Sequence, residues 1–145
     1  DTIADFNCRL AQETEDNTLD PATVTRGVTR FLQGVGAGFY IVAELQGRIA
    51  GCLMVTHEWS DWKDGNVWWI QSVYVPAEAR RRGVFRALFT WVQQRAEADS
   101  DVRGIRLYVE HDNERAQHTY KSLGMAREAY HMYGMLVGNT DRGSS

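Results

Sequence analysis

The stretch VYVPAEARRRGVFRALF (residues 73–89) passes from a β-branched, aromatic segment through proline and three consecutive arginines into a helical pattern. Cations are unfavourable at a helix start, which carries a partial positive charge, unless an anion binds beside them. Free N–H groups, Gly83 and the flanking guanidinium groups together are typical of a phosphate site. Three solvated arginines would also fit this pattern. The stretch contains neither GxxxxGK[ST] nor GxGxxG, the two common nucleotide loops.

The segments around this stretch have apolar residues at helical or alternating spacing and predict a single sheet with helices. Asp20 is suited to cap the second helix, Pro21 fits its first turn, and Gln46-Gly47 fits a tight hairpin. In chain order we expect a helix over 3–12, a helix over 21–33, strands over 39–45, 48–57 and 67–75, a helix over 84–98, a strand over 104–110, a helix from Asn113 to Leu123 stopped by Gly124, and a β segment over 126–137. This order predicts an α/β (α+β) fold with a single mixed, mostly antiparallel sheet flanked by helices.

Length and composition narrow the class of protein. The chain has 145 residues, 43% of them hydrophobic, which suits one globular domain with its own core. A net charge of −3 argues against nucleic acid as a partner. The two cysteines suit a reducing compartment, and no apolar run is long enough to span a membrane. We therefore expect a cytoplasmic protein without a nucleic-acid or membrane partner.

Two motifs carry a resemblance to a known family. The segments 73–75 and 80–88 resemble the acyl-CoA pyrophosphate loop of the GNAT family of N-acetyltransferases, whose pattern is Gln/Arg-x-x-Gly-x-Gly/Ala. Arg80 and Gly83 match this pattern, whereas Phe85 departs from it. A second conserved stretch of the family is matched, in the same order along the chain, by Leu107-Tyr108-Val109, Asn113, Ala116, Tyr120 and Leu123-Gly124-Met125. Met125 stands where an aromatic residue is commoner.

The resemblance implies a GNAT-like acyl-CoA N-acyltransferase fold and acetyl-CoA as co-substrate, without a metal. The family fold begins with a strand before its first helix, so the first strand is expected to be missing and the chain truncated before Asp1. One sheet edge would then be unpaired or completed by another chain. The single acetyltransferase domain, 1–145, would comprise N-terminal helices at the substrate side (1–38), an acetyl-CoA-binding core (39–137) and a polar tail (138–145).

By this resemblance the cofactor-binding residues lie along the strand end, the arginine-glycine turn and the start of a later helix. They are Val73, Tyr74, Val75, Arg80, Arg81, Arg82, Gly83, Val84, Phe85, Arg86, Ala87 and Asn113. A strand edge can hydrogen-bond the peptide-like pantetheine arm, and an N–H near Val73 could hold the carbonyl oxygen as charge develops on it. Asn113 could equally act only as a helix cap.

Tyr120 is the predicted catalytic residue. The leaving CoA thiolate needs a proton, and a phenol held against the sulfur can supply it. The alternative is a tyrosine that packs on the core face of its helix with Ala116 and Leu123. The base that deprotonates the amine is unassigned among Glu58, Asp61 and Glu110, with His57 and His111 as weaker candidates.

The acceptor is expected to be a small cationic amine. The stretch 57–64 combines carboxylates with Trp59 and Trp62, which suits a cation through charge and cation–π contacts. The acidic stretch 13–16 would flank the entrance of the same substrate site. The predicted substrate-binding residues are Glu58, Trp59, Asp61 and Glu110. The tryptophans could instead anchor a loop or contact a second copy of the chain, so a homodimer stays open.

The predicted function is that of a transferase: direct attack of a primary amine on the acetyl thioester, without a covalent enzyme intermediate. The alternative is a non-catalytic acyl-CoA-binding or sensing domain on the same fold. A nucleic-acid-binding module on the arginines is disfavoured by the negative net charge. Zinc-site spacings and the GxSxG elbow of a serine nucleophile are absent from the sequence.

Overall fold

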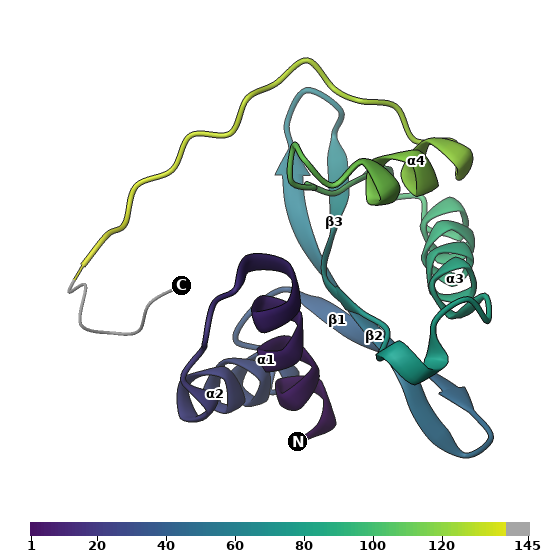
Figure 1. The fold of residues 1–145 in the computed structure, drawn as a ribbon. Helices are drawn as coiled ribbons and strands as arrows, with labels where there is room; N and C mark the ends of the chain where they lie inside the picture. Colours follow the sequence, from purple (N-terminus) through teal and green to yellow (C-terminus); the bar gives the residue numbers. More distant parts are fainter. Residues whose placement is uncertain (139–145) are drawn as a thin grey trace. The chain divides into compact units, whose positions relative to one another are not determined.

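The computed structural model describes residues 1–138 and divides them into two compact units, Asp1–Leu107 and 108–138 (Figure 1). The predicted tail over 138–145 lies outside the described residues except for Gly138. The elements of the first unit are α1 (Thr2–Glu15), α2 (Pro21–Leu32), β1 (Gly38–Leu45), β2 (Arg48–Ser60), β3 (Gly65–Tyr74), the short 3₁₀-helix η1 (Ala77–Ala79), α3 (Val84–Ala98) and β4 (Val102–Arg106). The second unit contains α4 (Glu114–Ser122).

The sheet has the order β1-β2-β3-β4. The first two pairings are antiparallel and the pairing of β3 with β4 is parallel, which confirms the mixed, mostly antiparallel sheet. Strand β2 is central and is buried on both faces from Ala50 to Leu53. The sheet therefore needs helices on both faces to cover its core.

A β-bulge interrupts β3. Cys52 pairs with Tyr74 and Met54 pairs with Gln71, so two residues of β3, Ser72 and Val73, lie opposite one residue of β2. Ser72 has a φ of 51°, which is unusual for a residue that carries a side chain. A bulge bends its strand. The parallel pairing with β4 ends before it, at Trp69 and Arg106.

Helices α1 and α2 cover one face of the sheet and α3 covers the other (Figure 1). On the first face, Phe6 of α1 packs with Cys52 and Tyr74, and the rings of Phe6 and Tyr74 are 5.1 Å apart. On the second face, Phe39 contacts Trp68 at 5.2 Å and Trp91 of α3 at 6.1 Å between ring centroids. Leu53, Val55 and Val92 are fully buried.

Local signals place the helix ends. The carboxylate of Asp20 accepts hydrogen bonds from the backbone N–H groups of Ala22 and Thr23, and Pro21 opens the helix, as predicted. The prediction of α3 over 84–98 is confirmed. Helix α1 is longer than the predicted 3–12, ending at Glu15 with Asp16 in the left-handed region. None of the described helices is long and apolar enough to cross a membrane.

Both hairpins of the sheet are tight. The predicted turn Gln46-Gly47 is confirmed, with φ values of 54° and 76° that suit the twist of a two-residue hairpin. Strand β2 is longer than the predicted 48–57, because residues 58–60 continue it and pair with β3 as far as Ser60 and Gly65. The turn itself spans 61–64.

In the second unit, Asn113 caps α4 by accepting a hydrogen bond from the N–H of Ala116, and Gly124 follows the helix with a φ of 92°. Two strand predictions are corrected. Strand β4 ends at Arg106 instead of at 110, where its pairing with β3 ends. Residues 126–137 form no strand although their composition favours one, because a strand also needs a paired neighbour for its N–H and C=O groups.

Candidate functional site

The arginine-glycine turn connects the end of β3 to α3. It contains η1, then Arg80 in an extended conformation, Arg81 at a φ of 63° and Gly83 at a φ of 76°. Gly83 is the N-cap of α3, and no side chain caps the helix. The first N–H groups of a helix have no partner inside it. The turn therefore presents uncapped helix-start donors with a partial positive charge, an arrangement that suits a phosphate group.

Three arginines lie in the sequence on either side of the helix start. Arg81, Arg82 and Arg86 are exposed, and no hydrogen bond or ion pair to them is found among the described residues. Val84 is buried and anchors the helix start against β2. Gly51 makes this anchor fit, since a Cβ added there would lie 2.9 Å from Cγ1 of Val84.

The bulged end of β3 lies next to this turn in the chain. From Gln71 to Tyr74 the strand continues past its last pair with β4, so this edge has no parallel partner strand in the first unit. Val73 and Val75 are half-buried, whereas Tyr74 is buried toward α1. An open strand edge offers N–H and C=O groups to an extended, peptide-like ligand.

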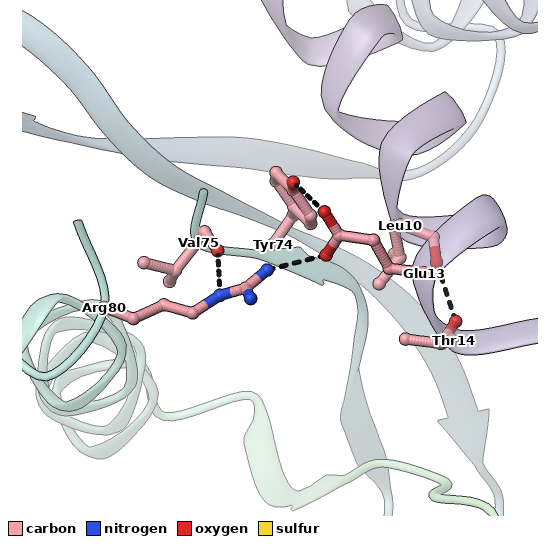
Figure 2. A network of polar contacts seen from close by, with 6 residues as sticks. All are labelled: Leu10, Glu13, Thr14, Tyr74, Val75 and Arg80. Atoms are coloured by element: carbon pink, nitrogen blue, oxygen red, sulfur yellow. Dashed lines mark hydrogen bonds and ion pairs between the residues drawn. The ribbon is translucent and has the colours of Figure 1, made fainter. Parts of the chain in front are cut away.

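A polar network joins α1, β3 and the turn (Figure 2). Arg80 donates from Nη2 to Oε2 of Glu13 at 2.6 Å and from Nε to the carbonyl oxygen of Val75 at 2.9 Å. The hydroxyl of Tyr74 donates to Oε1 of Glu13 at 2.8 Å. The hydrogen bond from Tyr74, followed by that from Arg80, lowers the pKa of Glu13, and burial raises the pKa of Tyr74.

The sequence predicts Glu13 only as part of an acidic stretch beside the substrate. The structure turns its carboxylate onto Tyr74 and Arg80 instead. A signal for this was present, because Phe6, Leu10 and Glu13 follow helical spacing and Phe6 and Leu10 face the sheet. The partner residues were not identifiable, since Glu13 and Arg80 are far apart in the sequence.

The remaining predicted cofactor and catalytic residues belong to the second unit. Asn113 forms the cap of α4, and the amide of Gln117 donates to the carbonyl oxygens of Glu110 and His111. Tyr120 is half-buried on α4, and burial raises the pKa of its phenol. The phenol therefore keeps its proton at neutral pH, as a proton donor must.

Three of the four predicted acceptor residues, Glu58, Trp59 and Asp61, lie on the β2–β3 hairpin, whereas Glu110 lies in the second unit. Trp59 and Trp62 are 61% and 93% exposed, and Asp61 is in the turn. Glu58 is already engaged, since it accepts a hydrogen bond from Arg106 of β4 at 2.9 Å. His57 stacks on Trp68 with 5.9 Å between ring centroids.

Arg103 ties this hairpin to β4. It donates from Nε to the carbonyl of Lys63 at 3.0 Å and from Nη2 to that of Asp64 at 2.9 Å, and its Nη1 bonds the carbonyl of Ser100. Neither Arg103 nor Arg106 was among the predicted site residues. Among residues 1–138, no three His, Cys, Asp or Glu side chains gather as a metal site.

Comparison with known proteins identifies the family that has this fold. The model of the acetyltransferase (GNAT) family matches residues 7–125. The structure of a possible acetyltransferase from Clostridium difficile 630 is 43% identical, with a TM-score of 0.88 over 95% of this chain and 91% of that one. No protein of curated function matches the sequence.

Two more distant structures share the fold alone. A ribosomal-protein-alanine N-acetyltransferase from Brucella melitensis biovar Abortus 2308 is 17% identical, with a TM-score of 0.71 and 94% of each chain covered. An aminoglycoside acetyltransferase from an uncultured soil metagenomic sample is 19% identical, with a TM-score of 0.69, covering 94% of this chain and 89% of that one. The family match extends over most of the sequence and agrees with the fold. The chain therefore belongs to the GNAT family and is an acetyl-CoA-dependent N-acetyltransferase.

Proposed function

We propose that the chain transfers the acetyl group of acetyl-CoA to the primary amine of a small cationic acceptor by direct attack. The observation that carries this proposal is the uncapped start of α3, with Gly83 and three exposed arginines, directly after the bulged end of β3. The first feature suits a pyrophosphate and the second suits a pantetheine arm. Their order along the chain matches the order of the two groups in acetyl-CoA.

In this proposal the pyrophosphate lies on the N–H groups around Arg82 to Ala87, flanked by guanidinium groups. The pantetheine arm runs along the open edge of β3 from Val73 to Val75. A backbone N–H near Val73 holds the thioester oxygen while negative charge develops on it. The bulge supports this role, because it removes residues of β3 from regular pairing with β2.

The transfer moves two protons. The amine nitrogen attacks the carbonyl carbon, the carbon–sulfur bond breaks, and the CoA thiolate takes a proton from the phenol of Tyr120, which regains a proton from the attacking nitrogen as the amide forms. The amine must first lose a proton, which costs about 4 kcal/mol at pH 7.4 for a lysine-like amine. Asp61 and Glu110 are the proposed bases in preference to Glu58, whose carboxylate is paired with Arg106.

The cationic acceptor is supported by the exposed end of the β2–β3 hairpin. Trp59 and Trp62 offer aromatic faces, and Asp61 and Asp64 add negative charge beside them. Polyamines, lysine-like amines and aminoglycosides share this chemistry. An alanine-starting peptide is a useful contrast in the same assay, since it presents an amine with a lower pKa.

The test is calorimetric titration with acetyl-CoA, followed by release of CoA thiol over this amine panel. We expect binding, and thiol release that is largest with the cationic small amines. Binding without thiol release from any amine would favour the sensing alternative. Failure to bind acetyl-CoA would contradict the proposal as a whole.

Tyr120→Phe tests the proton donor in the same assay. Loss of general acid catalysis is expected to lower kcat by about 10²–10⁴-fold while the Kd for acetyl-CoA stays unchanged. Equal turnover in wild type and Tyr120→Phe would remove Tyr120 from the mechanism. Asp61→Lys should raise KM for a cationic amine more than for the alanine-starting peptide.

A further inference from the structure

Arg80 differs from the other arginines of the turn. Two of its three guanidinium nitrogens are bonded within the protein, Nε to the Val75 carbonyl and Nη2 to the carboxylate of Glu13 (Figure 2). Among the described residues, no hydrogen bond or ion pair engages Arg81, Arg82 or Arg86. The four arginines therefore divide into one that is held by the protein and three that are available to an anion.

We propose that Glu13 is a positioning residue for acetyl-CoA. It holds Arg80, which then stabilises the conformation of the turn and does not serve as a phosphate ligand. The inference rests on the proposed function, because it concerns how the acetyl-CoA turn is kept in shape. It assigns to α1, an element outside both sequence motifs, a role in cofactor affinity.

A buried ring fixes the carboxylate of Glu13. Tyr74 is 4% exposed, its ring packs against Phe6, and its hydroxyl bonds Oε1 of Glu13. The guanidinium carbon of Arg80 lies 5.9 Å from the centroid of the same ring. Arg80 is therefore located by a rigid aromatic residue as well as by a charge, which favours one geometry over the many that an exposed arginine can adopt.

The network also depends on the chemistry of a carboxylate. Both oxygens of Glu13 accept, one from Tyr74 and one from Arg80. A glutamine of the same shape has one accepting oxygen and an amide nitrogen that only donates. If its oxygen accepts from Tyr74, its nitrogen faces the N–H groups of Arg80; if its oxygen accepts from Arg80, its nitrogen donates to the hydroxyl oxygen of Tyr74 and the negative charge is still lost. In both orientations Glu13→Gln should weaken the hold on Arg80 while changing the side-chain volume very little.

Releasing Arg80 affects the turn at the residue that follows η1. The bond from Nε of Arg80 to the Val75 carbonyl closes the turn on the end of β3, and Gly83, three residues later, is the N-cap of α3. A turn that has to be ordered when the ligand binds lowers affinity. Glu13 contacts no reacting atom in this scheme, so the expected change is in Kd and KM for acetyl-CoA, with kcat preserved at saturation.

The experiment measures the Kd for acetyl-CoA by calorimetry, and kcat and KM with the best amine. The variants are Glu13→Gln, Arg80→Met and the double variant. Glu15→Gln is the matched control, because it removes an exposed carboxylate of α1 for which no hydrogen bond or ion pair is found among the described residues. An ion pair that is close to half exposed justifies a loss of about three- to fivefold in affinity for Glu13→Gln. The double variant should bind no more weakly than Arg80→Met.

The outcomes separate this inference from the function on which it rests. If the wild type binds acetyl-CoA and Glu13→Gln binds it equally well, the inference is wrong and the function stands. An equal loss in Glu15→Gln, or losses that multiply in the double variant, would also overturn it. If the wild type does not bind acetyl-CoA, the function fails and the inference with it.

A folding check accompanies the titrations. Should Glu13→Gln unfold, Tyr74→Phe provides the test, because it keeps the buried ring and removes only the hydroxyl that fixes Glu13. About a twofold rise in Kd is then expected. An unchanged Kd in a folded Tyr74→Phe protein would contradict the role of the ring.

Discussion

Replacing Gly51 by alanine should push the start of α3 away from the sheet. The added Cβ would lie 2.9 Å from Cγ1 of Val84, 3.2 Å from the carbonyl oxygen of Tyr74 and 3.3 Å from Cγ2 of Val75. Carbon atoms in contact prefer about 3.5–4.0 Å. Val84 cannot simply rotate away, because a β-branched side chain in a helix has one strongly preferred rotamer.

Two effects oppose each other in this variant. Overpacking a buried site costs about 1–3 kcal/mol, whereas replacing glycine in the unfolded chain gains about 0.4–1 kcal/mol. The clash should win, because two of the three neighbouring atoms belong to a stiff side chain and to the backbone. A net loss of about 1–2 kcal/mol corresponds to a Tm lowered by roughly 3–8 °C in a domain of this size.

Thermal unfolding followed by circular dichroism measures this loss, and calorimetry measures the accompanying rise in Kd for acetyl-CoA. Val84→Ala removes the clashing methyl group, so Gly51→Ala should cost less stability in the Val84→Ala background than in the wild type. Stability losses that add in the double variant would refute the steric argument. So would a Gly51→Ala protein that melts at the wild-type temperature.

Three further predictions concern the core and the hairpin. Burial raises the pKa of Cys52 from 9.0 to about 11. The neutral thiol therefore contributes about 2–3 kcal/mol to the free energy of unfolding, which is fully present below pH 9 and lost as the pH rises through 11. Denaturant titrations should show this loss in the wild type and not in Cys52→Ala. At pH 8 a thiol reagent should modify the half-buried Cys8 well before Cys52, and equal rates would contradict the burial of Cys52. Arg103→Met should free the turn at Lys63 and speed tryptic cleavage there, with Arg95→Met as control; an unchanged cleavage rate would show that Arg103 does not hold the turn.

The parts of the fold that could be predicted are those with a local cause. Asp20 and Pro21 mark a helix start by their own chemistry, and Gln46-Gly47 tolerates the positive φ of a tight hairpin. Residues 126–137 have the composition of a strand and are not one, because strand formation depends on a partner as well as on propensity. The same limit explains why β4 ends earlier than its sequence suggests.

The features of the predicted site also divide into those with a local cause and those that depend on distant segments. The arginine-glycine turn was recognisable, because its donors and charges lie within a few residues of one another. The engagement of Arg80 by Glu13 and of Glu58 by Arg106 was not, because each pair joins segments that only the sheet brings together. Sequence alone therefore indicated which residues carry charge near the site, but not which charges are already neutralised.

The bulge at Ser72 also divides β3 into two half-strands of opposite phase. Residues two apart on a regular strand share a face, yet Gln71 and Tyr74, three apart, pair with Met54 and Cys52 on the same face of β2. The first half-strand directs Trp68 toward the layer of α3, and the second directs Tyr74 toward the layer of α1. If residues 71–74 paired regularly instead, the ring of Tyr74 would turn to the opposite layer and Glu13 would lose its partner, whereas deleting Ser72 would remove the bulge and keep Tyr74 opposite Cys52. The extra residue thus sets which layer of helices receives the ring of Tyr74, and with it the contact to Glu13.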